Sequence, residues 1–164
     1  MNWIDLKTDT ITAALRYPGS VSLVFASHKR PGGGYKNHER GQEEWIARRT
    51  NLVDRLQPYL HLYGDNTKPF YIVLDGLKIH GTGETRDFIC VPAPLAPRKG
   101  FPSLYENVHE ELKTRVVWMC RLIHKYPVFI TGAWGCGFFG NKLEDVKELF
   151  RRHAENETVI FAIK

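Results

Sequence analysis

Two acidic residues follow a run of glycines early in the chain, and their spacing could support acid–base chemistry. The run is Pro31-Gly32-Gly33-Gly34, and after seven further residues comes Gln42-Glu43-Glu44. Glycines let the backbone adopt positive φ and approach a ligand without a Cβ in the way, so that N–H groups can hold phosphate or ribose oxygens. Acidic residues at the start of a helix can be explained by the helix dipole alone. Beside a glycine run they favour instead a site where a carboxyl group transfers protons.

A second glycine-rich segment extends over residues 132–141, with the sequence GAWGCGFFGN. Ordering so many glycines on folding has a large cost in conformational entropy, so a loop with a purely structural role rarely contains them. We expect this segment to hold a diphosphate by its backbone N–H groups, with an aromatic ring packed on a ribose or base. The alternative is a tight strand-to-helix turn with buried aromatic residues. No Lys-Ser or Lys-Thr pair ends the segment, so it is not a Walker loop.

Short apolar runs and helical spacings predict the elements that position these segments. Strands are expected at 21–25, 70–74, 87–91, 128–131 and 158–163, and helices from about 42, over 105–126 and over 143–153. The first strand would then begin about twenty residues into the chain. This alternation argues for a sheet with helices on its faces, in one domain over 1–164. Because ligands bind at the carboxyl ends of strands in such folds, both glycine segments should lie at one edge of the sheet.

Composition narrows the class of protein. With 164 residues, 43% of them hydrophobic and 25% charged, the chain reads as an ordinary globular domain without a signal peptide or membrane span. Cys90, Cys120 and Cys136 suggest neither a disulfide framework nor a metal site, which favours a reducing, cytoplasmic setting, and Cys136 reads as a packing residue rather than a nucleophile. The net charge of +5 fits a polyanionic partner or a solvated basic surface equally well.

Several of these segments together resemble the signature of the poly(ADP-ribose) glycohydrolases, in particular the bacterial, macrodomain-like type. The family pattern is a glycine triplet followed at short distance by Gln-Glu-Glu, and residues 132–139 look like its diphosphate-binding loop. The resemblance is carried by Phe25-Ala26-Ser27, by the two constellations above and, more weakly, by Val91-Pro92-Ala93-Pro94 and Phe161-Ala162-Ile163. It implies a macrodomain-like α/β fold with a mixed sheet between helices, and a hydrolase that binds ADP-ribose and releases it from poly(ADP-ribose). No cofactor or metal is expected, because Glu43-Glu44 is the only acidic pair in a candidate site and no further acids join it.

The resemblance also implies roles for individual residues. Glu44 would be the general acid, and Glu43 would position the ribose hydroxyls. Adjacent helical side chains diverge by about 100°, so the two cannot flank the bond from opposite faces, and water would attack with Glu44 acting as base in return. The helix N-terminus would lower the pKa of Glu44, whereas burial and Glu43 would raise it. Substrate-binding residues would be Ser27, Gly32, Gly33, Gly34, Gln42, Gly135, Cys136, Gly137, Phe138 and Phe139.

Departures from the family pattern keep other substrates open. Val24 stands where family members often have Asn, and His38 where they often have Gly, which puts the rim of the site and its specificity in question. The chain also looks like a minimal version of longer bacterial members. A hydrolase of mono-ADP-ribosyl groups on protein or nucleic acid, or of another ADP-ribose derivative, is one alternative. A reader of ADP-ribose without turnover is another, although paired carboxylates favour an enzyme.

Other residues near the two segments are given simpler roles. His28 and His38 are expected at the surface rather than in catalysis. Arg48 stands four residues after Glu44, so that the two could pair on one helix face. A valine in place of Gly135 is expected to weaken ligand binding far more than folding, because its side chain would intrude on the diphosphate or block a positive φ.

Overall fold

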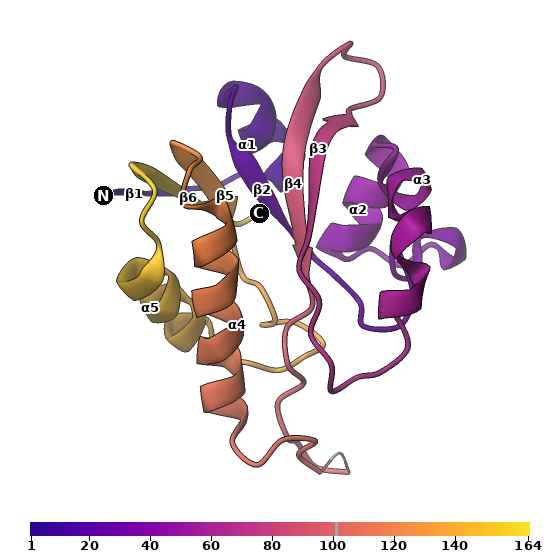
Figure 1. Ribbon diagram of the computed structural model, residues 1–164, viewed down its shortest axis with the longest axis vertical. Helices are drawn as coiled ribbons and strands as arrows, with labels where there is room; N and C mark the ends of the chain where they lie inside the picture. Colours follow the sequence, from indigo (N-terminus) through magenta and orange to yellow (C-terminus); the bar gives the residue numbers. More distant parts are fainter. Residues whose placement is uncertain (101) are drawn as a thin grey trace.

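The computed structural model describes residues 1–100 and 102–164 and is built on a six-stranded sheet in the order β1-β6-β5-β2-β4-β3 (Figure 1). Neighbouring strands are parallel except for the antiparallel pair β3–β4. The mixed sheet that was expected is therefore confirmed. The strands are β1 (Asn2–Leu6), β2 (Val21–Phe25), β3 (Ile72–Lys78), β4 (Thr85–Val91), β5 (Val128–Thr131) and β6 (Thr158–Ala162).

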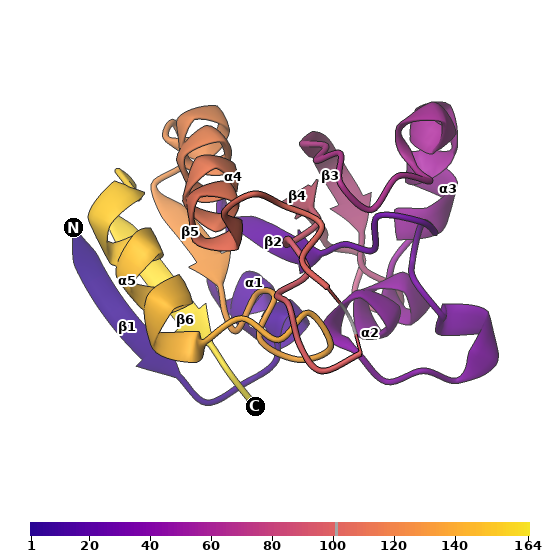
Figure 2. The same cartoon turned by 90° about the horizontal axis from the view of Figure 1, so that it is seen from below.

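Helices pack on both faces of this sheet, as in a macrodomain (Figure 2). One apolar cluster joins the sheet to α4 and α5, and two others join its opposite face to α1, α2 and α3. The helices are α1 (Thr10–Arg16), α2 (Gln42–Arg49), α3 (Leu52–Leu56), α4 (Val108–Ile123) and α5 (Leu143–His153), with short 3₁₀ helices η1 (Tyr35–Asn37) and η2 (Gln57–Leu62).

Strand β2 lies at the centre of this arrangement and sends alternate side chains to the two faces. Leu23 packs in the cluster beneath α4 and α5, whereas Val24 packs with Ile46 of α2 on the other face. Val24 is fully buried. Its replacement of the family's Asn therefore changes the core beneath α2, and the expectation that it alters the rim of the site is wrong.

The first strand begins at Asn2, not about twenty residues into the chain as expected. It is an edge strand paired only with β6, and its half-exposed residues lack the apolar run that marks a buried strand. The helix expected from residue 42 across Leu52 is two helices, α2 and α3. Thr50 separates them, because it forms a β-bridge with Ile79 and its hydroxyl accepts the N–H of Leu52.

The strands that precede the two glycine-rich segments have the predicted bounds. β2 and β5 are parallel neighbours, with Val21 opposite Phe129. Both segments therefore leave the sheet at the same edge, which confirms the predicted placement.

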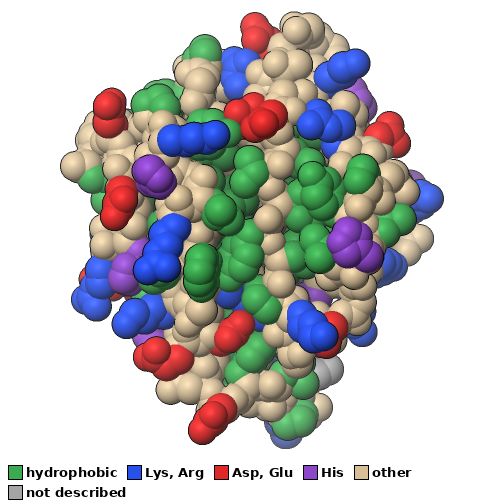
Figure 3. Space-filling view, viewed as in Figure 1, with side chains coloured by type: hydrophobic (Ala, Val, Ile, Leu, Met, Phe, Trp, Pro, Cys, Tyr) green, Lys and Arg blue, Asp and Glu red, His purple; other side chains and the backbone are tan. Residues whose placement is uncertain are grey.

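The face seen in Figure 1 is only partly covered by helices. Apolar side chains gather there between α4 and α3, over β3 and β4 (Figure 3). Tyr71, just before β3, and Val73, within β3, are half-buried against the cluster beneath α4. Within residues 1–100 and 102–164, no helix has the length and apolarity that a membrane crossing requires.

Candidate active site

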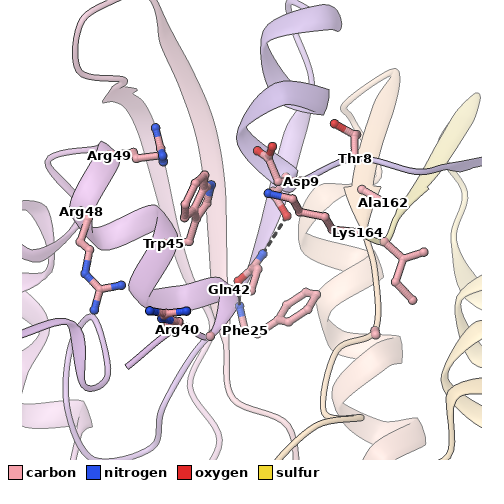
Figure 4. Close-up of a pocket in the computed structure, with 14 residues that line it drawn as sticks. Thr8, Asp9, Phe25, Arg40, Gln42, Trp45, Arg48, Arg49, Ala162 and Lys164 are labelled. Atoms are coloured by element: carbon pink, nitrogen blue, oxygen red, sulfur yellow. Dashed lines mark hydrogen bonds between the residues drawn. The ribbon is translucent and has the colours of Figure 1, made fainter. Parts of the chain in front are cut away.

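The site begins where the central pair of strands stops pairing. β2 and β5 are paired only through Val21 and Ser22. Beyond that point the side-chain amide of Gln42, the first residue of α2, accepts the N–H of Phe25 at 2.8 Å and donates to the carbonyl of Leu23 at 2.7 Å (Figure 4). It also donates to the hydroxyl of Thr10 at 3.0 Å. Gln42 therefore fixes the start of α2 to β2 and α1, and its amide is fully engaged by the protein.

Glu43 and Glu44 follow on the first turn of α2 and both reach the glycine run. A Cβ added to Gly33 would lie 2.8 Å from Oε1 of Glu43 and 3.1 Å from the carboxyl carbon of Glu44. Gly33 has a φ of +59°, which favours glycine. The two carboxyl groups therefore lie close to the same glycine, although their Cα atoms lie at different positions around the helix. Both groups would approach a ligand from the same side.

Glu43 is the buried member of the pair. It is 4% exposed, and its Oε1 accepts the N–H of Ser27 at 2.9 Å. Its Oε2 is buried and has no hydrogen-bond partner among the described residues. Burial, together with the charge of Glu44, raises the pKa of Glu43 to about 8. Glu43 is therefore mostly a neutral acid at pH 7.

One cavity of about 840 Å³ brings both glycine-rich segments together with the two glutamates. Ten of the twelve residues predicted from the sequence line it, as does Phe25 from the end of β2. Those ten are Ser27, Gly33, Gly34, Gln42, Glu43, Glu44, Gly135, Gly137, Phe138 and Phe139.

Gly32 and Cys136 are the two predicted residues that do not line this cavity. A Cβ on Gly32 would lie 2.7 Å from Cγ2 of Val53 and 3.2 Å from Cβ of Ala47, so this glycine packs against the core beneath α2 and α3. Cys136 is half-buried against the core beneath α4 and α5. Burial raises the pKa of its thiol to about 11, which fits the packing role expected for it.

The second glycine segment is fastened to the loop that follows β4. The fully buried Trp134 donates its indole N–H to the carbonyl of Val91 at 2.8 Å. Asn141 donates its amide to the carbonyls of Pro94 and Gly135, at 2.8 and 2.9 Å. Trp134 therefore belongs to the core, and the aromatic rings that this segment offers to the cavity are Phe138 and Phe139.

Two glycines of this segment differ in what surrounds them. A Cβ on Gly135 would lie 2.5 Å from Cβ of Ala93 and 2.9 Å from the amide nitrogen of Asn141, at a φ of +72°. A Cβ on Gly137 would meet nothing within 4 Å. The expectation that valine at Gly135 would chiefly disturb the ligand is therefore wrong, because its side chain would strike the protein first.

A stretch between β4 and α4 also borders the cavity, and sequence reasoning missed it. Leu95, Pro102 and Leu104 line the wall opposite the glutamates' helix. Arg98 donates to the carbonyl of Phe138 at 2.9 Å and lies 4.7 Å from the centre of its ring. Apolar side chains among prolines were the available signal, but loops of this composition are common and point to no particular partner.

A second cavity of about 770 Å³ adjoins the first and shares Phe25, Gly41, Gln42 and Ala133 with it (Figure 4). Trp45 stands in its wall, with the guanidinium of Arg49 3.5 Å from the ring centre. The other cationic residues lining it are Arg40, Arg48 and Lys164, against the single carboxylate of Asp9. Four cationic side chains thus line a cavity next to the glutamates, an arrangement that suits an anionic ligand.

Known proteins resemble this chain in sequence and in fold. Residues 6–75 match a family model described as the catalytic domain of microbial-type poly(ADP-ribose) glycohydrolase (PARG). The resemblance to the poly(ADP-ribose) glycohydrolases is confirmed. No curated protein matches the chain.

Solved poly(ADP-ribose) glycohydrolases superpose on nearly the whole chain. The enzyme from Thermomonospora curvata is 25% identical with a TM-score of 0.81, covering 99% of this chain and 70% of its own. The enzyme from Deinococcus radiodurans, solved in complex with ADP-ribose, is 26% identical with a TM-score of 0.76, covering 99% of this chain and 77% of its own.

Three polar residues near the two glutamates were given roles from the sequence, and the structure corrects two of these roles. His28 is not at the surface: it is 2% exposed and lines the catalytic cavity. Arg48 donates to the backbone carbonyls of Tyr35 and Glu39 instead of pairing with Glu44, because the loop before α2 folds back over it. His38 is exposed as expected, but its φ of 61° is the only left-handed one among the described non-glycine residues.

Proposed function

We propose that this protein hydrolyses the ribose–ribose O-glycosidic bond of poly(ADP-ribose) and releases ADP-ribose. The observation that carries the proposal is the convergence of the Glu43 and Glu44 carboxyl groups on Gly33, in a cavity that the second glycine-rich segment completes. Cleavage of a ribosyl C–O bond builds oxocarbenium character and requires a proton for the departing oxygen. A carboxyl group beside a glycine run can approach that oxygen without steric hindrance.

We assign the proton transfer to Glu44, which lines the cavity and is half-buried. Its proton passes to the leaving oxygen as the C–O bond breaks. Water then adds to the ribosyl carbon and returns a proton to Glu44, so that the carboxyl group is regenerated. Both proton transfers use the carboxyl group of Glu44. For two adjacent glutamates on one side of the bond, this scheme is more suitable than one with a covalent intermediate on Glu43.

Glu43 is assigned the positioning of the ribose. As a neutral acid it can donate one hydrogen bond and accept others, and its unpartnered Oε2 is the atom free to do so. Its Oε1 is held by the N–H of Ser27, which fixes the direction of the side chain. A ribose with two neighbouring hydroxyls matches such a mixed donor and acceptor.

The two adjoining cavities suit a ligand with the length and charge of an ADP-ribosyl unit. The glycine segments can hold a diphosphate through backbone N–H groups in the first cavity. The second cavity offers the ring of Trp45 and the side chain of Phe25 for an adenosine. The relative from D. radiodurans was solved with ADP-ribose, which supports the same ligand here.

Product analysis tests both the substrate and the bond. The purified protein is given poly(ADP-ribose) and, separately, protein and nucleic acid carrying single ADP-ribosyl groups, each with and without excess EDTA. We expect ADP-ribose from the polymer at the same rate in both conditions. Release of AMP would contradict the bond assignment, and loss of activity with EDTA would contradict the metal-free mechanism. ADP-ribose from the mono-ADP-ribosylated substrates alone would replace the proposed substrate, and tight binding without turnover would indicate a reader.

We also propose a reducing, cytoplasmic setting. All three cysteines are free thiols, and Cys90 and Cys120 are buried. Burial raises the pKa of both thiols, so they are poorly suited to oxidation. Fractionation of the producing cells, with the protein detected by antibody, tests this placement.

A further inference from the structure

A buried arginine that belongs to neither glycine-rich segment contacts a histidine that lines the cavity of the two glutamates. Arg115 of α4 is fully buried, and its Nε donates to Glu111, one turn earlier, at 2.9 Å. Its Nη1 donates to the carbonyl of Pro92 at 2.8 Å and lies 2.9 Å from Nε2 of His28. Its Nη2 donates to the hydroxyl of Tyr105 at 2.9 Å. Every part of the guanidinium therefore has a partner, and one of those partners is a histidine in the wall of the cavity.

The contact between Arg115 and His28 fixes the protonation state of the imidazole. A guanidinium has only donors, so Nε2 of His28 must accept the hydrogen bond. An accepting Nε2 leaves the ring hydrogen on Nδ1 and makes the ring neutral. A second proton would put two cations in contact, and both burial and the charge of Arg115 accordingly lower the pKa of His28 to about 4.

The other ring nitrogen of His28 is Nδ1. Nδ1 of His28 makes no hydrogen bond with any described residue. The ring lies in the wall of the catalytic cavity and packs edge-on against Phe139 of the second glycine segment, with ring centres 5.7 Å apart. A donor N–H is thus left over where the two segments meet.

We infer that His28 is a ligand-binding residue whose Nδ1–H donates to a diphosphate oxygen, and that Arg115 is the positioning residue that holds its tautomer. This inference rests on the proposed function, which places the diphosphate between the two glycine segments. Because the imidazole is neutral, it adds a directed hydrogen bond rather than a charge. His28 would therefore select for an oxygen acceptor at one point instead of attracting anions in general.

The tautomer can be measured in the free protein. In ¹⁵N-histidine-labelled protein, the chemical shifts and ring couplings distinguish a protonated Nδ1 from a protonated Nε2. We expect His28 to show the Nδ1–H form without change between pH 5.5 and 8, and its Nδ1 signal to move when ADP-ribose is added. The Arg115→Lys variant should lose the single tautomer, because one ammonium group cannot serve all of these acceptors. An Nε2–H signal in the wild type would overturn the inference.

Binding of ADP-ribose by calorimetry supplies the second test. The His28→Phe variant keeps the ring packing and removes both nitrogens, and we expect its affinity to fall about 10-fold to 100-fold, as for a lost hydrogen bond to a charged acceptor. His28→Asn restores an N–H near the position of Nδ1 and should recover most of the loss. His124→Phe, at an exposed histidine after α4, is the matched control and should bind normally.

The outcomes separate this inference from the proposed function. Wild-type protein that binds ADP-ribose together with a His28→Phe variant that binds within twofold would overturn the role of His28 alone. Wild-type protein that does not bind ADP-ribose would overturn the proposed function, and the diphosphate contact with it. If His28→Phe fails to fold, the tautomer measurement and His28→Asn decide the question.

Discussion

The two glycine-rich segments look alike in the sequence but use their glycines differently. In the first, the space above Gly33 is filled by the carboxyl groups of Glu43 and Glu44. In the second, the space above Gly135 is filled by Ala93 and Asn141, and only Gly137 is open on its Cβ side. In the first segment, the missing side chain of Gly33 leaves room for the two carboxyl groups. In the second, the missing side chain of Gly135 lets the loop pack against Ala93 and Asn141.

This difference shows why glycine content alone cannot assign a ligand contact. A glycine can serve the ligand, the catalytic side chains or the packing of its own loop, and each use has a different response to substitution. In the present chain we expect Gly137, Gly33 and Gly135 to represent these three uses, in that order. The following expectations test that division, starting with the side chain that the first segment surrounds.

Removal of the acid should have the largest effect. We expect Glu44→Gln to lower kcat by about 10² to 10⁴, as for loss of a general acid, with ADP-ribose affinity nearly unchanged. Rates on poly(ADP-ribose) and calorimetric affinities are compared for wild type, Glu44→Gln and the exposed control Glu155→Gln. Near-normal turnover by Glu44→Gln would show that the first segment does not surround the catalytic acid.

A methyl group on Gly33 should come next. The added Cβ would push against both carboxyl groups at a φ of +59°, and a displacement of about 1 Å can cost about 10²-fold in rate. We expect Gly33→Ala to lose activity far more than thermal stability. A variant with full activity and a lower melting temperature would make the first segment structural, like the second.

Gly135 and Gly137 form a matched pair within the second segment. The contacts of 2.5 Å and 2.9 Å and the positive φ at Gly135 should make Gly135→Val less stable by about 3 kcal/mol. Gly137→Val should keep its stability and lose ADP-ribose affinity. Denaturant unfolding and calorimetry on both variants check this, and equal losses of stability would remove the distinction between the two positions.

The buried carboxyl of Glu43 should make stability depend on pH. Its pKa rises from 4.5 to about 8 on folding, so its favourable contribution is full below pH 4.5 and is lost as the pH rises toward 8. The slope that Glu43 adds is at most about 1.4 kcal/mol per pH unit. We expect Glu43→Gln to flatten the unfolding free energy between pH 5 and 8, whereas the exposed control Glu110→Gln should not. A wild-type curve that rises over this range, unaltered by Glu43→Gln, would contradict a neutral Glu43.

The smallest effect is expected at His38. A left-handed φ of 61° costs a residue with a side chain about 1 kcal/mol relative to glycine. His38→Gly should therefore raise the melting temperature by a few degrees without changing kcat. No rise in the melting temperature would mean that the imidazole compensates for its backbone strain.

Much of the site was readable from local patterns, and the reasons for the failures are physical. β2 and β5 are short apolar runs that end at turn-forming segments, so their bounds and the shared edge were predictable. The Gln-Glu-Glu motif located the catalytic cavity because a helix start keeps its residues together. β1 was missed because an edge strand buries too little to leave a pattern.

Contacts between distant parts of the chain were beyond reach. Nothing near His28 signals Arg115, which is 87 positions away and lies within the helix predicted over 105–126. The burial of Glu43 rather than Glu44 likewise depends on which side of α2 faces the sheet. Spacing in the sequence identified the pair of carboxyl groups, but only the packing of α2 shows that Glu43 is the buried one.

The side-chain amide of Gln42 has a consequence for the sheet itself. A side-chain amide has an N–H donor and a C=O acceptor, as a peptide group does. The amide of Gln42 therefore bonds to the carbonyl of Leu23 and the N–H of Phe25, in place of a strand residue that β5 does not supply. The sheet can therefore divide at its centre without leaving those two groups unpaired, and the ligand site occupies the resulting opening. Hydrogen exchange at the amide of Phe25 would then report directly on whether α2 is seated, since among the described residues it is the one backbone N–H that donates to the side chain of Gln42.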